Sequence, residues 1–112
     1  MARINAREFE RQARELCANS SNVMRVILLT ESIDHTQLRI FLTDRTFVDV
    51  YYHHISGKTA YAQIRDNKRI FGADNTRGYW HWHPRKDISL HIRVDGEITF
   101  EEFMKELEST FE

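Results

Sequence analysis

The chain is poor in cysteine and proline, with one residue of each, and it has no long apolar run. A single cysteine, Cys17, cannot form an internal disulfide, which is typical of proteins in a reducing compartment. No stretch approaches the roughly 18 apolar residues of a membrane-spanning helix, and the first residues lack the apolar core of a signal peptide. We therefore expect a cytoplasmic protein without a membrane partner.

The chain also lacks the features that divide a protein into parts, because it has no internal repeat, low-complexity tract or linker-like segment. At 112 residues it is long enough for one hydrophobic core but not for two. Its content of 41% hydrophobic and 12% aromatic residues is typical of a folded globular protein. We expect residues 1–112 to form a single domain.

The net charge of −1 hides an uneven distribution of charge along the chain. Residues 58–94 contain 8 Lys+Arg against 3 Asp+Glu, which is +5, and residues 95–112 contain 1 against 7, which is −6. A basic surface of this kind suits a phosphate-bearing partner. The alternative is that the basic and acidic segments neutralise each other in the fold, and the composition favours neither.

Two amphipathic helices are predicted, one near each end of the chain. Asn5 with Glu8, and Thr99 with Glu102, have the spacing of a capping box, in which each of the two residues bonds the other's backbone N–H. Apolar residues at helical spacing follow each cap, and the first helix should end near Ala18. The first apolar stripe is Phe9, Ala13, Leu16 and Cys17, and the second is Phe100, Phe103, Met104, Leu107 and Phe111.

The segment between these helices is predicted to form β-strands joined by short turns. Residues 23–29 are rich in β-forming side chains, and residues 37–42 alternate apolar and polar positions. The turns are too short for the crossovers that parallel strands need. We therefore predict an α+β fold, an antiparallel meander sheet of five to six strands with an N-terminal and a C-terminal helix packed on one face.

Residues 69–91 are the chemically densest part of the chain, since they contain both tryptophans, the only proline and three of the six histidines. In residues 79–83, Tyr-Trp-His-Trp-His, polar and apolar side chains alternate. In an extended strand His81 and His83 therefore share one face, while Trp80 and Trp82 share the other. We expect the indole rings to face the core and the imidazole rings to face solvent or a cleft.

The spacing of His81 and His83 allows more than one kind of chemistry. Two positions along a strand place their Cα atoms about 6.6 Å apart. This separation permits joint ligation of a metal ion, and it equally permits an acid and a base on either side of one phosphate. Exposed histidines without any ligand are a further alternative. A metal ion would need a third ligand, for which the candidates are His91, Asp74, His53 and His54.

Arginines and a polar loop surround the same histidines. Arginine presents planar donors that suit phosphate, and three flank this segment: Arg65, Arg69 and Arg77. The loop at residues 72–78 is bounded by glycines but matches neither a P-loop nor a dinucleotide-binding fingerprint. Asp74 is placed to orient a histidine, and Tyr79 is a candidate for stacking on a base. The alternative to a phosphate-binding groove is that these arginines and histidines lie on an ordinary solvated face of the sheet.

The order of elements and a set of residues within it resemble the TumE family, whose members are small toxin components of bacterial and archaeal toxin–antitoxin systems. The residues that carry the resemblance are an Arg-x-Phe-x-x-Asp-Asn step and the histidines after it: Arg69, Phe71, Asp74, Asn75, His81, His83 and His91. In this chain residues 76–79 lie between the Asp-Asn step and the histidine segment, whereas family members often continue the Asp-Asn step directly with Pro-His-His. The resemblance implies a toxin that attacks RNA and that a cognate antitoxin protein binds.

The first hypothesis for the function is a metal-independent ribonuclease toxin without a cofactor. Histidines would transfer protons at the ribose and at the leaving oxygen, and arginines would stabilise the charged transition state. The catalytic candidates are His81, His83, His91, Arg69 and Arg77, and the substrate-binding candidates are Arg65, Asp74, Asn75 and Tyr79, with no residue assigned as a metal ligand. The antitoxin, RNA and a second copy of the chain are the partners under consideration.

The second hypothesis is a non-catalytic α+β module in which the histidine cluster binds a metal ion or a protein partner. A third is a purely structural subunit, in which the histidines have no role of their own. The metal content of the protein, and the effect of replacing the histidines, distinguish these hypotheses.

Overall fold

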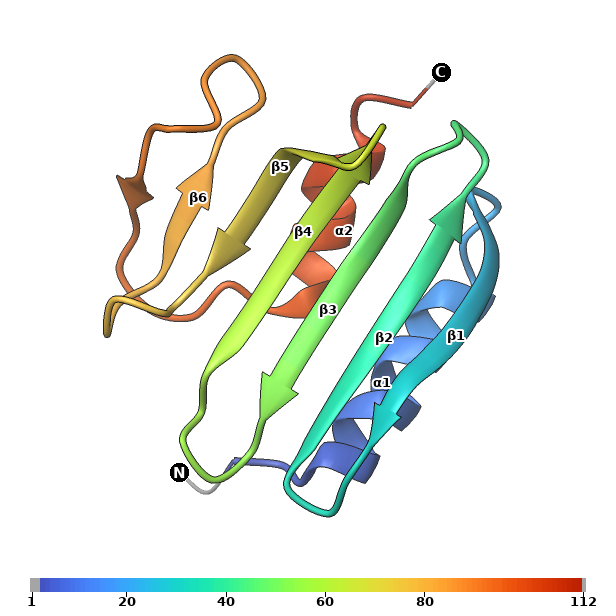
Figure 1. The fold of residues 1–112 in the computed structure, drawn as a ribbon, viewed down its shortest axis with the longest axis vertical. Coiled ribbons are helices and arrows are strands. Elements are labelled where there is room, and N and C mark those ends of the chain that lie inside the picture. The colour runs from blue at the N-terminus through green and yellow to red at the C-terminus, as the bar shows by residue number, and fades with distance from the viewer. Residues whose placement is uncertain (1–2, 112) are drawn as a thin grey trace.

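The computed structural model describes residues 3–111, apart from the side chain of Glu31, and contains an antiparallel sheet with one helix near each end of the chain (Figure 1). Neighbouring strands in the sequence are also neighbours in the sheet, so the sheet is a meander. The predicted α+β fold is therefore confirmed. Its elements are α1 (Ala6–Ala18), β1 (Val23–Glu31), β2 (His35–Leu42), β3 (Phe47–His53), β4 (Thr59–Arg65), β5 (Lys68–Asp74), β6 (His81–His83), β7 (Ile92–Arg93) and α2 (Phe100–Glu108).

The sheet has seven strands within the described chain, more than the five or six expected. The difference arises at its C-terminal edge, where β6 has three residues and β7 has two. The alternation at residues 79–83 indicated the first of these strands, and pairing fixes the bounds of both. Pairing with β6, through His81↔Arg93 and Trp82↔Ile92, is what makes β7 a strand.

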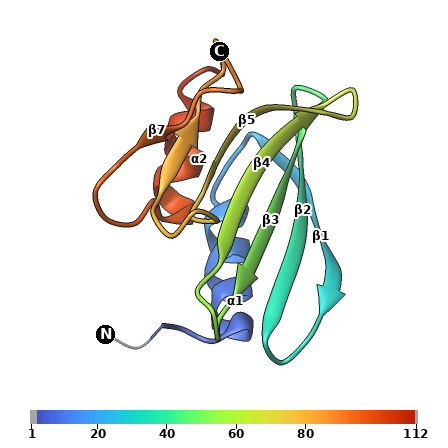
Figure 2. The ribbon, with the colours of Figure 1, turned by 60° about the vertical axis from the view of Figure 1, so that its left-hand side comes forward.

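Both helices pack on one face of the sheet, as predicted, and the two views of the ribbon agree on this (Figures 1 and 2). From α2, Phe103 is fully buried, and its ring stacks on Phe71 and Trp82 with centroid separations of 5.2 and 6.2 Å. Trp80 stacks on Tyr61 at 5.7 Å. The indole rings thus face the core, as expected. One core-facing row across the sheet consists of Leu38, Val50, Tyr61, Ala73 and Trp82.

The opposite side of the described sheet is covered by neither helix, and we call it the helix-free face (Figure 2). Residues paired across antiparallel strands point to the same side, so the register of the sheet identifies which side chains share this face. One row across it consists of Gln37, Tyr51, Ala60, Asp74, His81 and Arg93. The histidine strand therefore shares a surface with the centre of the sheet.

The helix caps follow the sequence, with one correction. Thr99 and Glu102 form the complete capping box predicted for α2. Asn5 caps α1 by accepting a hydrogen bond from the Glu8 backbone N–H, but the Glu8 carboxylate bonds Arg11 instead of returning to the cap. A nearby guanidinium offers a charged donor, which the backbone N–H does not. Within residues 3–111, no helix is long and apolar enough to cross a membrane.

We expect Phe103→Ala to lower the free energy of unfolding by about 3–5 kcal/mol, because it removes the ring at the centre of the aromatic cluster and leaves a cavity. Denaturant unfolding followed by circular dichroism measures this change. Leu29→Ala on edge strand β1, where the side chain is 46% exposed, should change stability by no more than about 0.5 kcal/mol. Equal effects of the two substitutions would show that the core does not lie between α2 and the sheet.

Candidate metal centre

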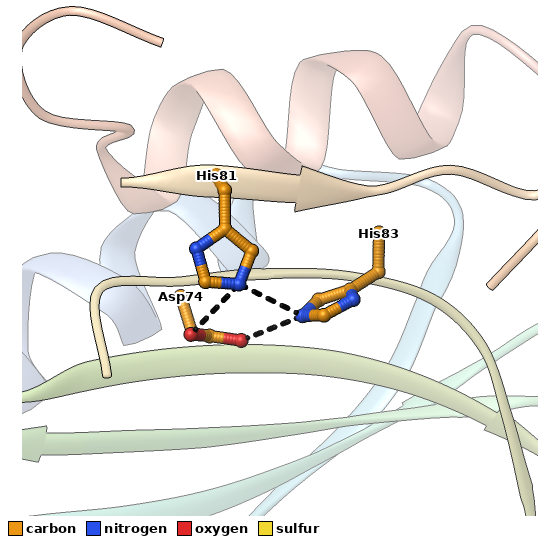
Figure 3. A group of neighbouring side chains, drawn as sticks. All are labelled: Asp74, His81 and His83. Atoms are coloured by element: carbon orange, nitrogen blue, oxygen red, sulfur yellow. Dashed lines mark hydrogen bonds and ion pairs between the residues drawn. The ribbon is translucent and has the colours of Figure 1, made fainter. Parts of the chain in front are cut away.

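The pairing of β5 with β6 brings an acidic residue and two histidines together on the helix-free face. Asp74 at the end of β5 lies opposite His81, and Gly72 lies opposite His83. The two imidazole side chains come from β6 and point toward the carboxylate of β5 (Figure 3). Residues nine positions apart in sequence thus form one cluster.

The three side chains meet through their ligand atoms. The Nε2 atoms of His81 and His83 are 3.1 Å apart, His83 Nε2 lies 2.9 Å from Asp74 Oδ2, and His81 Nε2 lies 3.3 Å from Asp74 Oδ1 (Figure 3). The residues are 1%, 4% and 6% exposed for His81, His83 and Asp74. The expectation that these histidines face solvent was therefore wrong, because neighbouring side chains on the same face cover them.

His91 is one of the covering side chains. Its ring stacks on that of His81 with centroids 4.9 Å apart and meets the ring of His83 edge-on at 4.7 Å. His91 itself is exposed. Partial desolvation, together with the positive charges of Arg77 and Arg69, holds the pKa of His91 below its usual value. The predicted arginines Arg69 and Arg77 therefore lie close enough to this edge of the cluster to act on it electrostatically.

Asp74 is held as a carboxylate. Burial raises its pKa, but hydrogen bonds from the Thr76 hydroxyl at 2.7 Å, from the Thr76 backbone N–H at 3.0 Å and from His83 outweigh burial and leave the pKa below its usual value. Donors to the charged form stabilise that form. The cluster consequently contains one fixed negative charge facing two imidazole rings.

Ring packing orients the histidines. The Nδ1 atoms of His81 and His83 are buried without a hydrogen-bond partner among the described protein atoms. The His81 ring instead packs against the rings of His91 and Tyr79, whose centroids are 4.9 and 5.6 Å away. Both Nε2 atoms are thereby directed toward Asp74. Tyr79, a predicted substrate-binding residue, is half-buried and supports the cluster.

Gly72 makes room beside the cluster. A Cβ atom at this position would lie 2.9 Å from the backbone oxygen of Tyr61 and 3.3 Å from the Arg69 Cδ atom. Because Gly72 has no side chain, the stem of Arg69 can cross β5 next to His83. The approach of Arg69 to the histidines thus depends on a glycine.

Two predicted substrate-binding residues have other partners. Arg65 lies at the far end of the β4–β5 hairpin, opposite Lys68, and its guanidinium is 3.6 Å from Asp44. Asn75 accepts a hydrogen bond from the Thr59 backbone N–H and donates one to the carbonyl of the turn between β3 and β4. Arg65 is therefore remote from the cluster, and the Asn75 side chain ties the end of β5 to that turn.

Sequence reasoning missed two residues at this site. Thr76 supplies the two hydrogen bonds that fix Asp74. Arg93 pairs with His81 in the register of β6 and β7, and its guanidinium lies 4.4 Å from the centre of the Tyr79 ring. The alternation His91-Ile92-Arg93, read as a strand next to β6, would have placed Arg93 on the same face as the histidines.

The geometry suits a metal ion better than an acid–base pair. A tetrahedral ion with bonds of about 2.0–2.2 Å separates its ligand atoms by about 3.3–3.6 Å. The two Nε2 atoms are 3.1 Å apart, His83 Nε2 lies 2.9 Å from Asp74 Oδ2, and His81 Nε2 lies 3.3 Å from Asp74 Oδ1. The longest of these separations equals the lower limit of that range and the shortest is 0.4 Å below it. Two buried Nε2 atoms in mutual contact leave no room for a phosphate between them. His91 is not part of the group whose ligand atoms all lie within 4.8 Å of one another.

Comparison with models of known families, with curated proteins and with solved structures returned no match to this chain. The resemblance to the TumE family stays an expectation, as do the toxin activity and the antitoxin that it implies. The residues and their geometry are therefore the basis for any proposal about function.

We expect Gly72→Ala to lower the free energy of unfolding by about 1–3 kcal/mol, although replacing an unstrained glycine by alanine commonly stabilises a protein by about 0.4–1 kcal/mol. The closest atom to the added methyl group is the backbone oxygen of Tyr61, which cannot move without disturbing β4. The double variant Gly72→Ala/Arg69→Ala should therefore remain destabilised relative to Arg69→Ala alone. Full recovery in urea unfolding would assign the crowding to the Arg69 side chain instead.

Proposed function

We propose that this protein is a small metal-dependent hydrolase whose metal ion is bound by Asp74, His81 and His83. The observation that carries the proposal is the convergence of one carboxylate and two Nε2 atoms, with separations of 2.9–3.3 Å, in a buried cluster. Two imidazoles and a carboxylate form a donor set that suits Zn²⁺ and neighbouring divalent transition metals. The metal-independent mechanism of the first hypothesis is the alternative to this proposal.

Three protein ligands favour a catalytic centre over a structural one. Structural zinc sites are closed by four protein ligands, whereas catalytic sites keep one position for water or substrate. Among the described residues, the converging group has three members. A bound ion of this kind lowers the pKa of coordinated water and polarises an ester. Asp74 would supply the negative ligand, and Thr76 would hold that carboxylate in place.

Nearby cations favour an anionic substrate such as a phosphodiester. Arg69 and Arg77 act electrostatically on His91, whose ring covers both histidine ligands. Guanidinium groups beside a metal ion can bind the non-bridging oxygens of a phosphate and stabilise charge that develops there. Arg93, opposite His81, adds a third guanidinium at the same edge of the sheet. RNA, which the TumE resemblance implies, belongs to this class of substrate.

The first test is metal binding. Protein freed of metal by chelation and titrated with ZnCl₂ in a calorimeter should bind one ion per chain. His81→Ala and His83→Ala should each weaken binding by more than the roughly 10–100-fold that Thr76→Ala causes, because Thr76 only holds a ligand in place. His35→Ala should leave the affinity nearly unchanged, since this residue does not belong to the group. Equal zinc affinity in the wild type and in His81→Ala/His83→Ala would contradict the proposal.

The second test concerns activity. Expression of the wild-type protein in a bacterial host should arrest growth, and His81→Ala should relieve the arrest, with His35→Ala as the control that remains toxic. Purified protein should cleave RNA with added Zn²⁺ and lose this activity in a chelator, because the ion supplies the activated water. Cleavage that persists in the chelator would favour the metal-independent mechanism. Normal growth at high expression would count against a toxin.

A further inference from the structure

The helix-free face carries aromatic rings at a distance from the histidine cluster. Phe41 on β2 pairs with Phe47 on β3, and their ring centroids are 6.0 Å apart. Tyr51 lies farther along β3 and points to the same side, because it is an even number of residues from Phe47. All three rings are half-buried although no helix packs on this face. We call Phe41, Phe47 and Tyr51 the aromatic platform.

Each ring of the aromatic platform has a cation over it. The Arg25 guanidinium lies 4.9 Å from the centre of the Phe41 ring, that of Arg39 lies 4.2 Å from Phe47, and the Lys58 ammonium lies 6.0 Å from Tyr51. These cations come from β1, from β2 and from the turn before β4. Arg39 is also paired with Asp49 at 2.8 and 3.0 Å. The platform is thus a set of π-faces interleaved with positive charge.

Small residues connect the platform to the cluster. The register places Tyr51, Ala60, Asp74 and His81 in one row across the sheet, and Asp49, Ala62, Gly72 and His83 in the next. Strands β4 and β5 therefore contribute a row of small residues between Tyr51 and the histidines. We call Ala60, Ala62 and Gly72 the alanine–glycine strip. Tyr51 and His81 are three strand spacings apart, about 14 Å. A flexible chain lying on this strip would meet only the methyl groups of Ala60 and Ala62 on β4 and, at Gly72, the stem of Arg69.

We infer that the helix-free face binds a single-stranded nucleic acid, with bases stacked on the aromatic platform and the backbone crossing the alanine–glycine strip toward the histidine cluster. Sheet faces with exposed rings and cations are suited to this ligand, because every base has a π-face and every linkage carries a negative charge. Delivery of a phosphodiester to Asp74, His81 and His83 rests on the proposed function. Binding to the platform does not.

Charge complementarity favours this occupant over a second copy of the chain. By the register and the ring contacts, Arg25, Arg39, Lys58, Arg69 and Arg93 lie on or beside the face, together with the carboxylates of Asp49 and Asp74. Two such faces would repel each other, whereas a polyanion would neutralise them and release its counterions.

The experiment measures binding of fluorescein-labelled oligouridine and oligothymidine by anisotropy, using metal-free His81→Ala/His83→Ala protein so that no cleavage occurs. Phe47→Ala and Tyr51→Ala, added singly to this background, should each raise Kd by about 5- to 150-fold. Lys58→Gln should reduce the slope of log Kd against log salt by about 0.7. Ile33→Ala, in the β1–β2 turn and 87% exposed, and Arg7→Ala, on α1, are the controls and should change neither quantity.

Binding that is unchanged by both ring substitutions, in variants whose circular dichroism matches the parent, would overturn the inference. So would a duplex bound as tightly as the single strand, because paired bases cannot stack on the platform. Tighter binding of oligouridine than of oligothymidine would identify RNA as the ligand, and the reverse would identify DNA. A protein that binds the oligonucleotide but no zinc would refute the metal centre alone, and a protein that binds zinc but no oligonucleotide would refute the platform alone.

Discussion

The pairing of β5 with β6 is the interaction on which the site depends. It involves three residue pairs, Gly72↔His83, Ala73↔Trp82 and Asp74↔His81. Because side chains alternate along a strand, a slip of one residue would turn the indole rings away from the core and the imidazole rings into it. The stacking of Trp82 on Phe71, with centroids 5.5 Å apart, therefore fixes the side on which the histidines lie. Core packing and the position of the cluster are consequences of one register.

Sequence patterns predicted the elements best where the deciding interactions are local. The Thr99–Glu102 capping box involves residues three positions apart, and it forms as expected. At α1 both the cap backbone and Arg11 are within reach of the Glu8 side chain, and the Glu8 carboxylate pairs with Arg11. The bounds of the two-residue strand β7 depend on its pairing with β6, so a local pattern does not fix them. The short turns did indicate a meander, because each strand pairs with the next one along the chain.

The site was partly predictable for the same reason. Alternation placed His81 and His83 on one face and the tryptophans on the other. It could not show that both histidines are buried, because the cover comes from His91, which follows β6 after a loop. Asp74 was one of several possible third partners until the β5–β6 register selected it. Arg65 seemed equivalent to Arg69 in sequence, but its guanidinium lies 3.6 Å from Asp44, whereas the stem of Arg69 lies beside Gly72.

The cluster is hard to explain as a device for stability. Its carboxylate and imidazoles are almost fully buried, and two Nδ1 atoms have no partner among the described protein atoms. Burying polar groups without partners costs free energy, and well-packed apolar side chains in their place are often neutral or stabilising. The aromatic contacts around Phe103 already stabilise the other side of the same strands. A buried polar group that stability does not require points to a function, and here its ligand atoms converge on one point from which a metal ion could contact all three.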